Sequence, residues 1–103
     1  MSFEKRRIEL IYWVDSNRDG GWDSNQKYGE YAQADLHCRT IGMVSFESKD
    51  RVSLVHTDSA LGGSNGQMTI PKGAIVSRTV LVDGEKLQKL TNYSVKRPHK
   101  AKR

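Results

Sequence analysis

The sequence predicts a mostly β domain with one short helix, folded into a small and strongly bent β-barrel. Three observations support this: several short segments rich in β-branched and aromatic residues, polar turns between them, and one stretch with helical spacing of apolar residues. Strands this short cannot each bury a face in an open sheet. Curvature into a barrel lets each strand bury one face in a shared core, and it also removes exposed edges. With 103 residues, 36% of them hydrophobic, the chain has room for one modest core.

The first expected strand covers residues 7–14, because β-branched and aromatic side chains alternate there between two faces. A cluster of turn-forming residues at 15–21 ends it. A short helix is expected next, at about residues 25–36, where apolar residues from Tyr28 to Leu36 recur at four-residue spacing.

Four further short strands complete the expected order of one strand, one helix and four strands. Polar or glycine-containing turns separate them, and the apolar set of the first changes face between Met43 and Val44, which predicts a bulge or strong bend. A single helical turn at 85–90 follows the last strand. The four strands are expected at Thr40–Glu47, Arg51–Thr57, Gln67–Ile70 and Ala74–Val82.

The net charge is +5, from 17 basic and 12 acidic residues, and the C-terminal end carries the whole excess. We therefore divide the chain into one domain at residues 1–90 and a basic, flexible tail at 91–103. Such a tail attracts nucleic-acid phosphate without sequence preference, or serves only as a solvated terminus. Its five cations are Lys96, Arg97, Lys100, Lys102 and Arg103.

The sequence favours a cytoplasmic location and no membrane partner. No apolar run approaches the ~20 residues that cross a bilayer, and the chain opens into a strand-like segment rather than a signal peptide. The single cysteine, Cys38, has no second cysteine for an intrachain disulfide, which fits a reducing compartment.

Patterns for metal binding and catalysis are weak. Residues 15–20 match the first half of an EF-hand calcium loop, but Gln26 stands where a bidentate carboxylate belongs. A zinc site lacks a second cysteine at ligand spacing, and Cys38 with His56 shows no known catalytic signature. We therefore expect no metal, no cofactor and no catalytic residue, in a protein that binds rather than catalyses.

Aromatic residues are concentrated near the first turn, and Trp22 is the most informative of them. It stands in the turn between Gly21 and Asp23. A tryptophan in that position either offers a partly exposed surface on which a base stacks or caps one end of the barrel.

Two segments resemble the signatures of the Sm-like family, which includes the Hfq-type RNA chaperones. Residues 41–55 resemble the first signature, in which a glycine lets a strand bend and a tight turn returns it. Residues 67–77 resemble the second, a short strand and turn that closes a ring interface. The resemblance implies a small SH3-like or Sm-like β-barrel. The chain departs from the family in placing its helix after the first strand, and Pro71-Lys72-Gly73 replaces the family's aromatic-and-histidine pocket turn.

The whole chain also resembles small proteins of bacteriophages and prophages. The shared pattern is Ile-x-Trp-x-Asp-Ser, Gly-Trp, Gly-x-Val and Ile-Pro-Lys-Gly, found here at residues 11–16, 21–22, 42–44 and 70–73. Several compact, oligomeric phage proteins sequester nucleotide signals of bacterial immunity. The resemblance therefore implies an anti-defence role, or immune evasion, in the cytoplasm of a bacterial host cell.

The leading hypothesis is a non-enzymatic homo-oligomer that captures a nucleotide-like ligand at its subunit interfaces. A cyclic dinucleotide or a cyclic ADP-ribose variant fits this class. Cations meet phosphate, aromatic rings stack on a base, and small polar groups fix orientation. The candidate ligand-binding residues are Lys72 and Arg39 for phosphate, Trp22 and Tyr31 for the base, and Ser77 and Asn65 for orientation.

Three alternatives stay open. The same barrel with its basic tail predicts an RNA- or DNA-binding module, and an exposed helix predicts an inhibitor or adaptor that binds a host protein. A small hydrolase is the fourth hypothesis, although no acid–base pair stands out. The homo-oligomer is expected to form through strand edges beside Pro71 and in the 40–47 segment.

Overall fold

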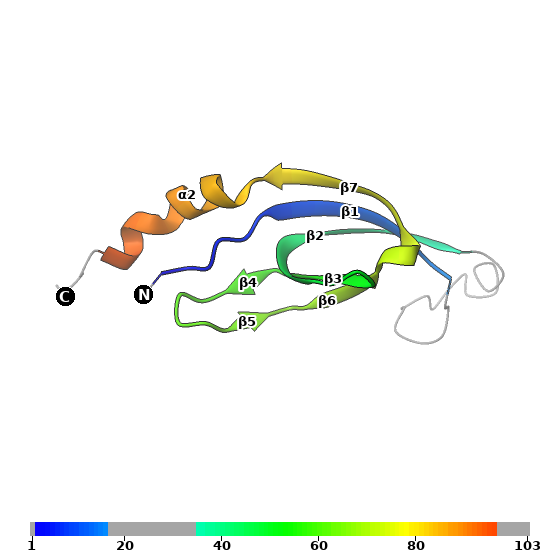
Figure 1. Cartoon of the computed structure of the whole chain (residues 1–103), viewed down its shortest axis with the longest axis horizontal. Coiled ribbons are helices and arrows are strands. Elements are labelled where there is room, and N and C mark those ends of the chain that lie inside the picture. Colours follow the sequence, from blue (N-terminus) through cyan, green and yellow to red (C-terminus); the bar gives the residue numbers. More distant parts are fainter. Residues whose placement is uncertain (1, 17–34, 97–103) are drawn as a thin grey trace, which may run out of the picture.

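The computed structural model of the chain describes residues 2–16 and 35–96 (Figure 1). This part is mostly β with one α-helix, as the sequence predicts, but it does not confirm the predicted barrel, because the sheet is open. Its elements are, in chain order, β1 Ile8–Asp15, β2 Leu36–Glu47, β3 Arg51–Val55, β4 Thr57–Asp58, β5 Ser64–Asn65, β6 Met68–Pro71, the 3-10 turn η1 Lys72–Ala74, β7 Ile75–Val82 and α2 Gly84–Lys96.

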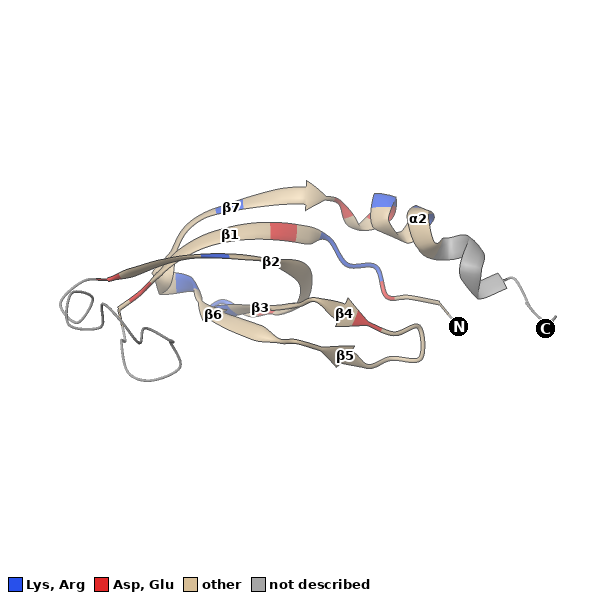
Figure 2. Cartoon of the chain, turned by 180° about the vertical axis from the view of Figure 1, so that it is seen from behind, with Lys and Arg blue, Asp and Glu red and all other residues tan. Residues whose placement is uncertain are grey.

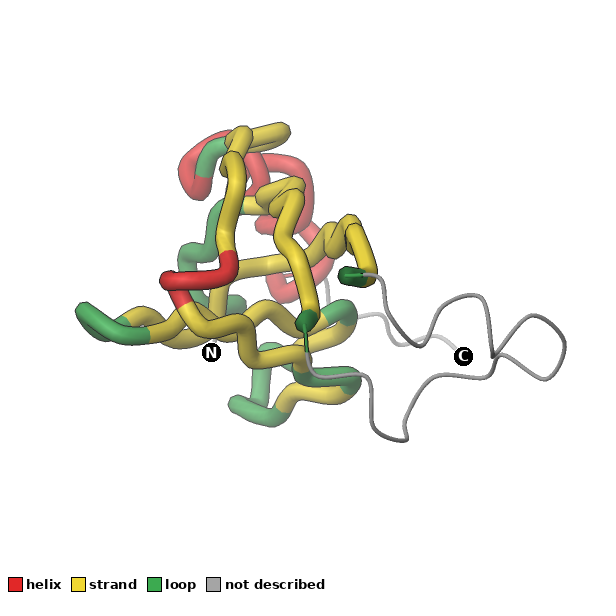
Figure 3. Tube along the Cα trace, turned by 90° about the vertical axis from the view of Figure 1, so that its right-hand side faces the viewer, coloured by secondary structure: helices red, strands yellow, loops and turns green. Residues whose placement is uncertain are grey.

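Five strands form one antiparallel sheet in the order β6-β3-β2-β1-β7, and β4 and β5 form a separate hairpin. The sheet bends strongly, so that β3 and β6 lie beneath β1 and β7 (Figures 1 and 3). It is not closed: among the described strands, β6 and β7 are its edges and do not pair. β6 has only four residues and ends at Pro71, which has no N–H to donate, so it offers little ladder for closure.

β2 makes the bend because it belongs to both halves of the sheet. Its residues up to Met43 pair with β1, and those from Met43 onward pair with β3. Gly42 lies at this join, where an added Cβ atom would stand 2.9 Å from the backbone oxygen of Val55. A register irregularity follows between Val44 and Phe46. The predicted bulge is therefore present, slightly later in the strand than expected.

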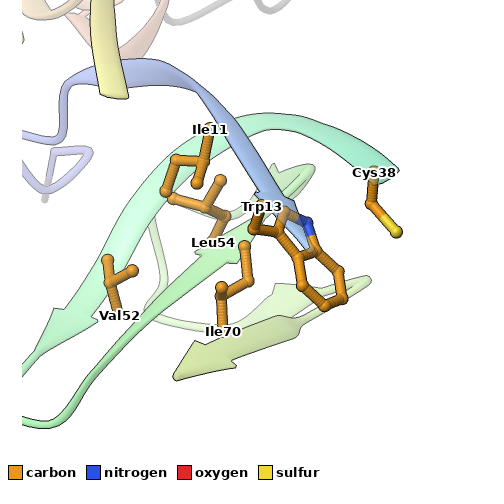
Figure 4. Close-up of a cluster of buried hydrophobic side chains, with 6 residues drawn as sticks. All are labelled: Ile11, Trp13, Cys38, Val52, Leu54 and Ile70. Atoms are coloured by element: carbon orange, nitrogen blue, oxygen red, sulfur yellow. The ribbon is translucent and has the colours of Figure 1, made fainter. Parts of the chain in front are cut away.

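The core lies between the two halves of the bent sheet (Figure 4). Its buried apolar side chains are Ile11, Trp13, Cys38, Val52, Leu54 and Ile70. The indole N–H of Trp13 donates a hydrogen bond to the Thr40 hydroxyl at 2.9 Å, so the buried donor is satisfied. The face of β1 that carries Ile11 and Trp13 is thus the core face. Leu10 and Tyr12 point to the opposite side of the sheet, here called the outer face.

Three sequence predictions around the strands need correction. β2 begins at Leu36, so the helix expected at 25–36 does not include that residue. Leu36 pairs with Asp15 and packs against the core instead. Residues 25–34 lie outside the described part. The glycine, serine and asparagine residues of 58–66 predict a loop, but part of this segment belongs to the hairpin of β4 and β5. In β2, the 40–47 segment is an interior strand rather than the expected free edge.

Helix α2 has 13 residues, whereas the sequence predicted one turn at 85–90. The Asp83 carboxylate accepts a hydrogen bond from the Lys86 N–H at 2.8 Å, as an N-cap does. The Gln88 side-chain amide donates to the Phe3 carbonyl at 2.8 Å, which ties the helix to the N-terminal segment. The helix runs past the boundary expected at residue 90 and takes in Lys96, the first cation of the predicted tail. Residues 97–103 lie outside the described part.

Candidate ligand-binding surface

A row of side chains crosses the outer face of the sheet at Tyr12. The register places Arg39 of β2 opposite Tyr12 on one side and Ser77 of β7 opposite it on the other. Directly opposed residues of antiparallel strands share a face. Two of the residues predicted from the sequence, Arg39 and Ser77, therefore flank one aromatic ring.

His37 holds the Tyr12 side chain in place. The Tyr12 hydroxyl and His37 Nδ1 form a hydrogen bond of 2.8 Å, and the two ring centroids lie 5.9 Å apart at an interplanar angle of 32°. His37 stands two residues before Arg39 on β2, so both side chains lie on the outer face. Two adjacent rings of fixed orientation are thus presented beside a guanidinium group.

These side chains surround an open hollow whose walls are mostly apolar. It is lined by Leu10, Tyr12, His37, Cys38 and Arg39. We call Leu10, Tyr12, His37 and Arg39 the Tyr12 surface. Among the described residues, Arg39 has no ion-pair partner. A planar group can stack on the rings, while the guanidinium binds an anion beside it.

Sequence reasoning missed Tyr12 and His37, although part of the signal was available. Alternation along the first strand separates Tyr12 from the face of Ile11 and Trp13, which become the core. Which of the two faces is buried depends on the pairing of β1 with β2 and β7, and the sequence does not state that register. The same register decides that His37 reaches the Tyr12 hydroxyl.

Lys72 lies elsewhere, in the 3-10 turn η1. Its Nζ atom forms an ion pair of 2.7 Å with Glu47. Arg78, on the core face of the sheet, binds the same carboxylate at 2.9 Å. Lys72 therefore belongs to a charged cluster and does not share a surface with Arg39, which lies on the outer face.

Asn65 is the one remaining predicted ligand-binding residue that the structure describes, and it does not join the Tyr12 surface. Asn65 is exposed on β5, opposite Thr57 in the hairpin. Trp22 and Tyr31 lie outside the described residues, as do Arg97, Lys100, Lys102 and Arg103 of the tail. Lys96 is the last residue of α2.

The charged cluster consists of three cations and two carboxylates on the core face, beyond Ile11. Glu9, whose side chain is only 3% exposed, receives Arg78 Nε at 2.8 Å and a second contact from Arg7. Glu47 receives Arg7 at 3.0 Å in addition to Lys72 and Arg78. Figure 2 shows the charged positions of β1 and β7 next to each other. The cluster joins β1, the end of β2, η1 and β7.

Mutual contact determines the protonation of this cluster. Burial alone would raise the pKa of Glu9, but hydrogen bonds from Arg78 and Arg7 and their charges outweigh it and lower that pKa. Hydrogen bonds from Arg78 and Lys72 hold the pKa of Glu47 well below its usual range. Hydrogen bonds to Glu47 and Glu9 raise the pKa of Arg78 further. Glu9, Glu47 and Arg78 are therefore charged at neutral pH.

The described residues offer no metal centre and no activated thiol. Residues 2–16 and 35–96 contain no group of three or more His, Cys, Asp or Glu side chains placed to hold a metal ion. Most of the calcium-loop-like turn lies outside these ranges. Burial, and secondly the charge of Asp15, raise the pKa of the Cys38 thiol, which disfavours the reactive thiolate. No helix in these ranges combines the length and apolar character needed to cross a membrane.

Comparison with protein-family models, with curated proteins and with solved structures gives no match to this chain.

Proposed function

We propose that this chain is a non-catalytic binding protein for a nucleotide-like ligand, and that the Tyr12 surface is its binding site. The observation that carries the proposal is the row in which Tyr12, fixed by His37, lies beside Arg39 on an open face of the sheet. Base stacking on an aromatic ring and charge-assisted hydrogen bonding to phosphate are the two interactions that nucleotide recognition needs.

In the proposed complex, a base lies against Tyr12 and His37 and a phosphate meets the Arg39 guanidinium. Ser77, on the other side of Tyr12, offers a hydroxyl that both donates and accepts hydrogen bonds. A cyclic dinucleotide or a cyclic ADP-ribose variant, the ligands implied by the resemblance to phage proteins, contains both a base and phosphate. Sequestration of such an immune signal is the biological role that follows from the proposal.

A single-stranded RNA or DNA is the second candidate, and the open shape of the surface favours it. An exposed sheet face with aromatic side chains can accept successive bases of an extended strand, whereas small-molecule sites are usually enclosed.

A bent five-stranded antiparallel sheet with a 3-10 turn between its edge strands also supports an SH3-like or Sm-like barrel class.

Isothermal titration with cyclic dinucleotides, cyclic ADP-ribose variants and short single-stranded RNAs tests the proposal. Tyr12→Ala is expected to weaken the ligand that binds by about 1–3 kcal/mol through lost stacking. Tyr12→Phe keeps the ring and should weaken it less. Arg39→Ala is expected to cost about 1.5–3 kcal/mol through the lost charged hydrogen bond.

Lys72→Ala is the matched control, because it removes a cation that lies in the charged cluster instead of on the Tyr12 surface. It should leave the affinity unchanged. The proposal fails if no nucleotide or oligonucleotide binds, or if Tyr12→Ala and Arg39→Ala bind as tightly as the unaltered chain.

A further inference from the structure

Phe46 is a large aromatic residue that β2 exposes on the outer face of the sheet. Simple alternation from Val44, which packs against the core, would place Phe46 on the core face as well. The register irregularity between these two residues reverses this, so that Phe46 lies opposite Ser53 of β3. Ser53 points away from the core because its neighbour Val52 points into it. Phe46 is therefore 50% exposed.

The guanidinium group of Arg51 lies over the Phe46 ring. Its Cζ atom is 5.7 Å from the ring centroid, within the range of a cation–π contact. Arg51 stands two residues before Ser53 on β3, so both side chains project from the same face. Stacking on a ring limits the rotamers of the long side chain, so an anion that binds the guanidinium costs less conformational entropy.

The positive charge of Arg51 is available to a ligand. None of the ion pairs within residues 2–16 and 35–96 includes Arg51, and the residue is exposed to solvent. The cations of the charged cluster differ, because carboxylates bind all three of them. A stacked guanidinium without a carboxylate partner can direct its N–H groups to a phosphate.

Uncharged hydrogen-bonding groups continue this part of the outer face beyond Phe46. Ser53 lies opposite Thr69 of β6, and their hydroxyl groups form a hydrogen bond of 2.8 Å. The Gln67 side-chain amide donates to the Thr69 hydroxyl at 3.3 Å, and both of these residues are exposed. Unpaired bases and their phosphates are bound by this combination of ring, guanidinium, hydroxyl and amide. A carboxylate of an acidic peptide would use only the cation.

We propose that the Phe46–Arg51 pair is a binding site for single-stranded nucleic acid. An unpaired base stacks on the pair, and the adjoining phosphate binds the Arg51 guanidinium. The pair lies where the end of β2 joins β3, in the lower half of the bent sheet (Figure 1). The Tyr12 surface lies on β1 and the first half of β2, so the two sites are separate. The inference does not rest on the ligand proposed for the Tyr12 surface.

Fluorescence anisotropy with a labelled oligouridylate of about 12 nucleotides tests this site. Phe46→Ala is expected to weaken binding by at least about fivefold through lost stacking, and Arg51→Ala by about tenfold or more. Arg51→Ala should also reduce the slope of log affinity against log salt concentration by about 0.7, the contribution of one phosphate contact. Phe46→Ala should leave that slope unchanged, because it removes no charge.

Lys49→Ala is the matched control, because it removes an exposed cation two residues from Arg51, in the turn between β2 and β3. It should bind the oligouridylate like the unaltered chain. Arg51→Lys keeps the charge but lacks the planar guanidinium, so it should recover the salt slope without the full affinity. Because Arg51 is exposed, its variants keep the site testable even where Phe46→Ala disturbs the fold.

Several results would overturn the proposal. They are an oligouridylate that does not bind, a folded Phe46→Ala or Arg51→Ala variant that binds it as tightly as the unaltered chain, and an equal loss in Lys49→Ala and Arg51→Ala. Displacement of the oligouridylate by an oligoglutamate peptide of equal charge would also overturn it, since the site would then select charge alone. A small nucleotide at the Tyr12 surface should bind these variants unchanged, so the two proposals can fail separately.

Discussion

Glu9 occupies a core position of β1, in line with Ile11 and Trp13, and it is a carboxylate. It is tolerated because Arg78 binds it through two nitrogen atoms, at 2.8 and 3.0 Å, and Arg7 adds a third contact. Glu9→Gln would replace the most buried carboxylate of the cluster by a neutral amide and leave Glu47 as the one carboxylate that still binds Arg78. We expect it to lower the free energy of unfolding by about 3 kcal/mol, as breaking a buried pair does, measured by urea denaturation.

Glu85→Gln is the control for that measurement, because the ion pair of Glu85 with Lys5 is exposed and 3.4 Å long. Its loss should change the free energy of unfolding by less than about 0.5 kcal/mol. An equal effect of Glu9→Gln and Glu85→Gln would mean that the buried cluster does not contribute to stability.

Acid should destabilise the fold through the same two carboxylates. The pKa values of Glu9 and Glu47 lie below their ordinary value of 4.5 in the folded chain, so the unfolded chain binds more protons in acid. Their contribution to stability is therefore complete above about pH 4.5 and declines as the pH falls below it toward the folded pKa values. We expect the urea midpoint to fall over that range, and to fall less steeply in a Glu9→Gln, Glu47→Gln double variant. Equal slopes would contradict this assignment.

Single residues also show where sequence reasoning ends. The sequence assigns Lys72 to a phosphate, whereas in the structure its side chain forms an ion pair with Glu47. Arg39 and Ser77 do lie together, but only because strand register places both beside Tyr12. A sequence indicates which residue types suit a ligand. Long-range pairing decides which of them meet.

At the scale of elements, Gly42 is the residue that lets β2 serve both halves of the sheet. A Cβ atom there would lie 2.9 Å from the Val55 carbonyl oxygen and 3.2 Å from the Leu54 Cβ atom. Because the first contact is with backbone, β2 and β3 would have to separate. We expect Gly42→Ala to lower the free energy of unfolding by about 1–3 kcal/mol, as overpacking does, measured by chemical denaturation.

Gly73→Ala is its matched control, since no atom lies within 4 Å of the Cβ position at Gly73. It should change stability by no more than about 0.5 kcal/mol. If both substitutions were neutral, the close approach at Gly42 would not govern the bend.

The existence of most strands was easier to predict from the sequence than the residues at which the elements begin and end. Runs of β-branched residues and the turns between them located β1, β3, β6 and β7 within a few residues, because alternation is a local property. β2 begins four residues before its predicted start because Leu36 to Arg39 pair with β1, a partner distant in sequence. Helix α2 continues beyond its predicted turn, and its cap at Asp83 and its tie to Phe3 support it.

At the scale of the whole molecule, the distribution of charge distinguishes oligonucleotide binding that uses the C-terminal cations from binding of a small nucleotide at the Tyr12 surface. The last seven residues carry four cations, Arg97, Lys100, Lys102 and Arg103, so removing residues 97–103 reduces the net charge from +5 to +1 (5 − 4 = 1). Helix α2 ends at Lys96, so this truncation leaves every described element whole. Each phosphate contact to a single strand contributes about 0.7 to the slope of log affinity against log salt concentration.

We therefore expect the truncated chain to bind single-stranded oligonucleotides with a salt slope smaller by up to about 3, because as many as four phosphate contacts are lost. Binding of one nucleotide-sized ligand should not change, since the Tyr12 surface supplies its own cation in Arg39. Fluorescence anisotropy with a labelled oligonucleotide at several salt concentrations measures the first effect, and isothermal titration measures the second. A truncated chain with an unchanged slope would show that the terminal cations do not contact the nucleic acid. A truncated chain that no longer binds the small ligand would show that the site extends beyond the sheet.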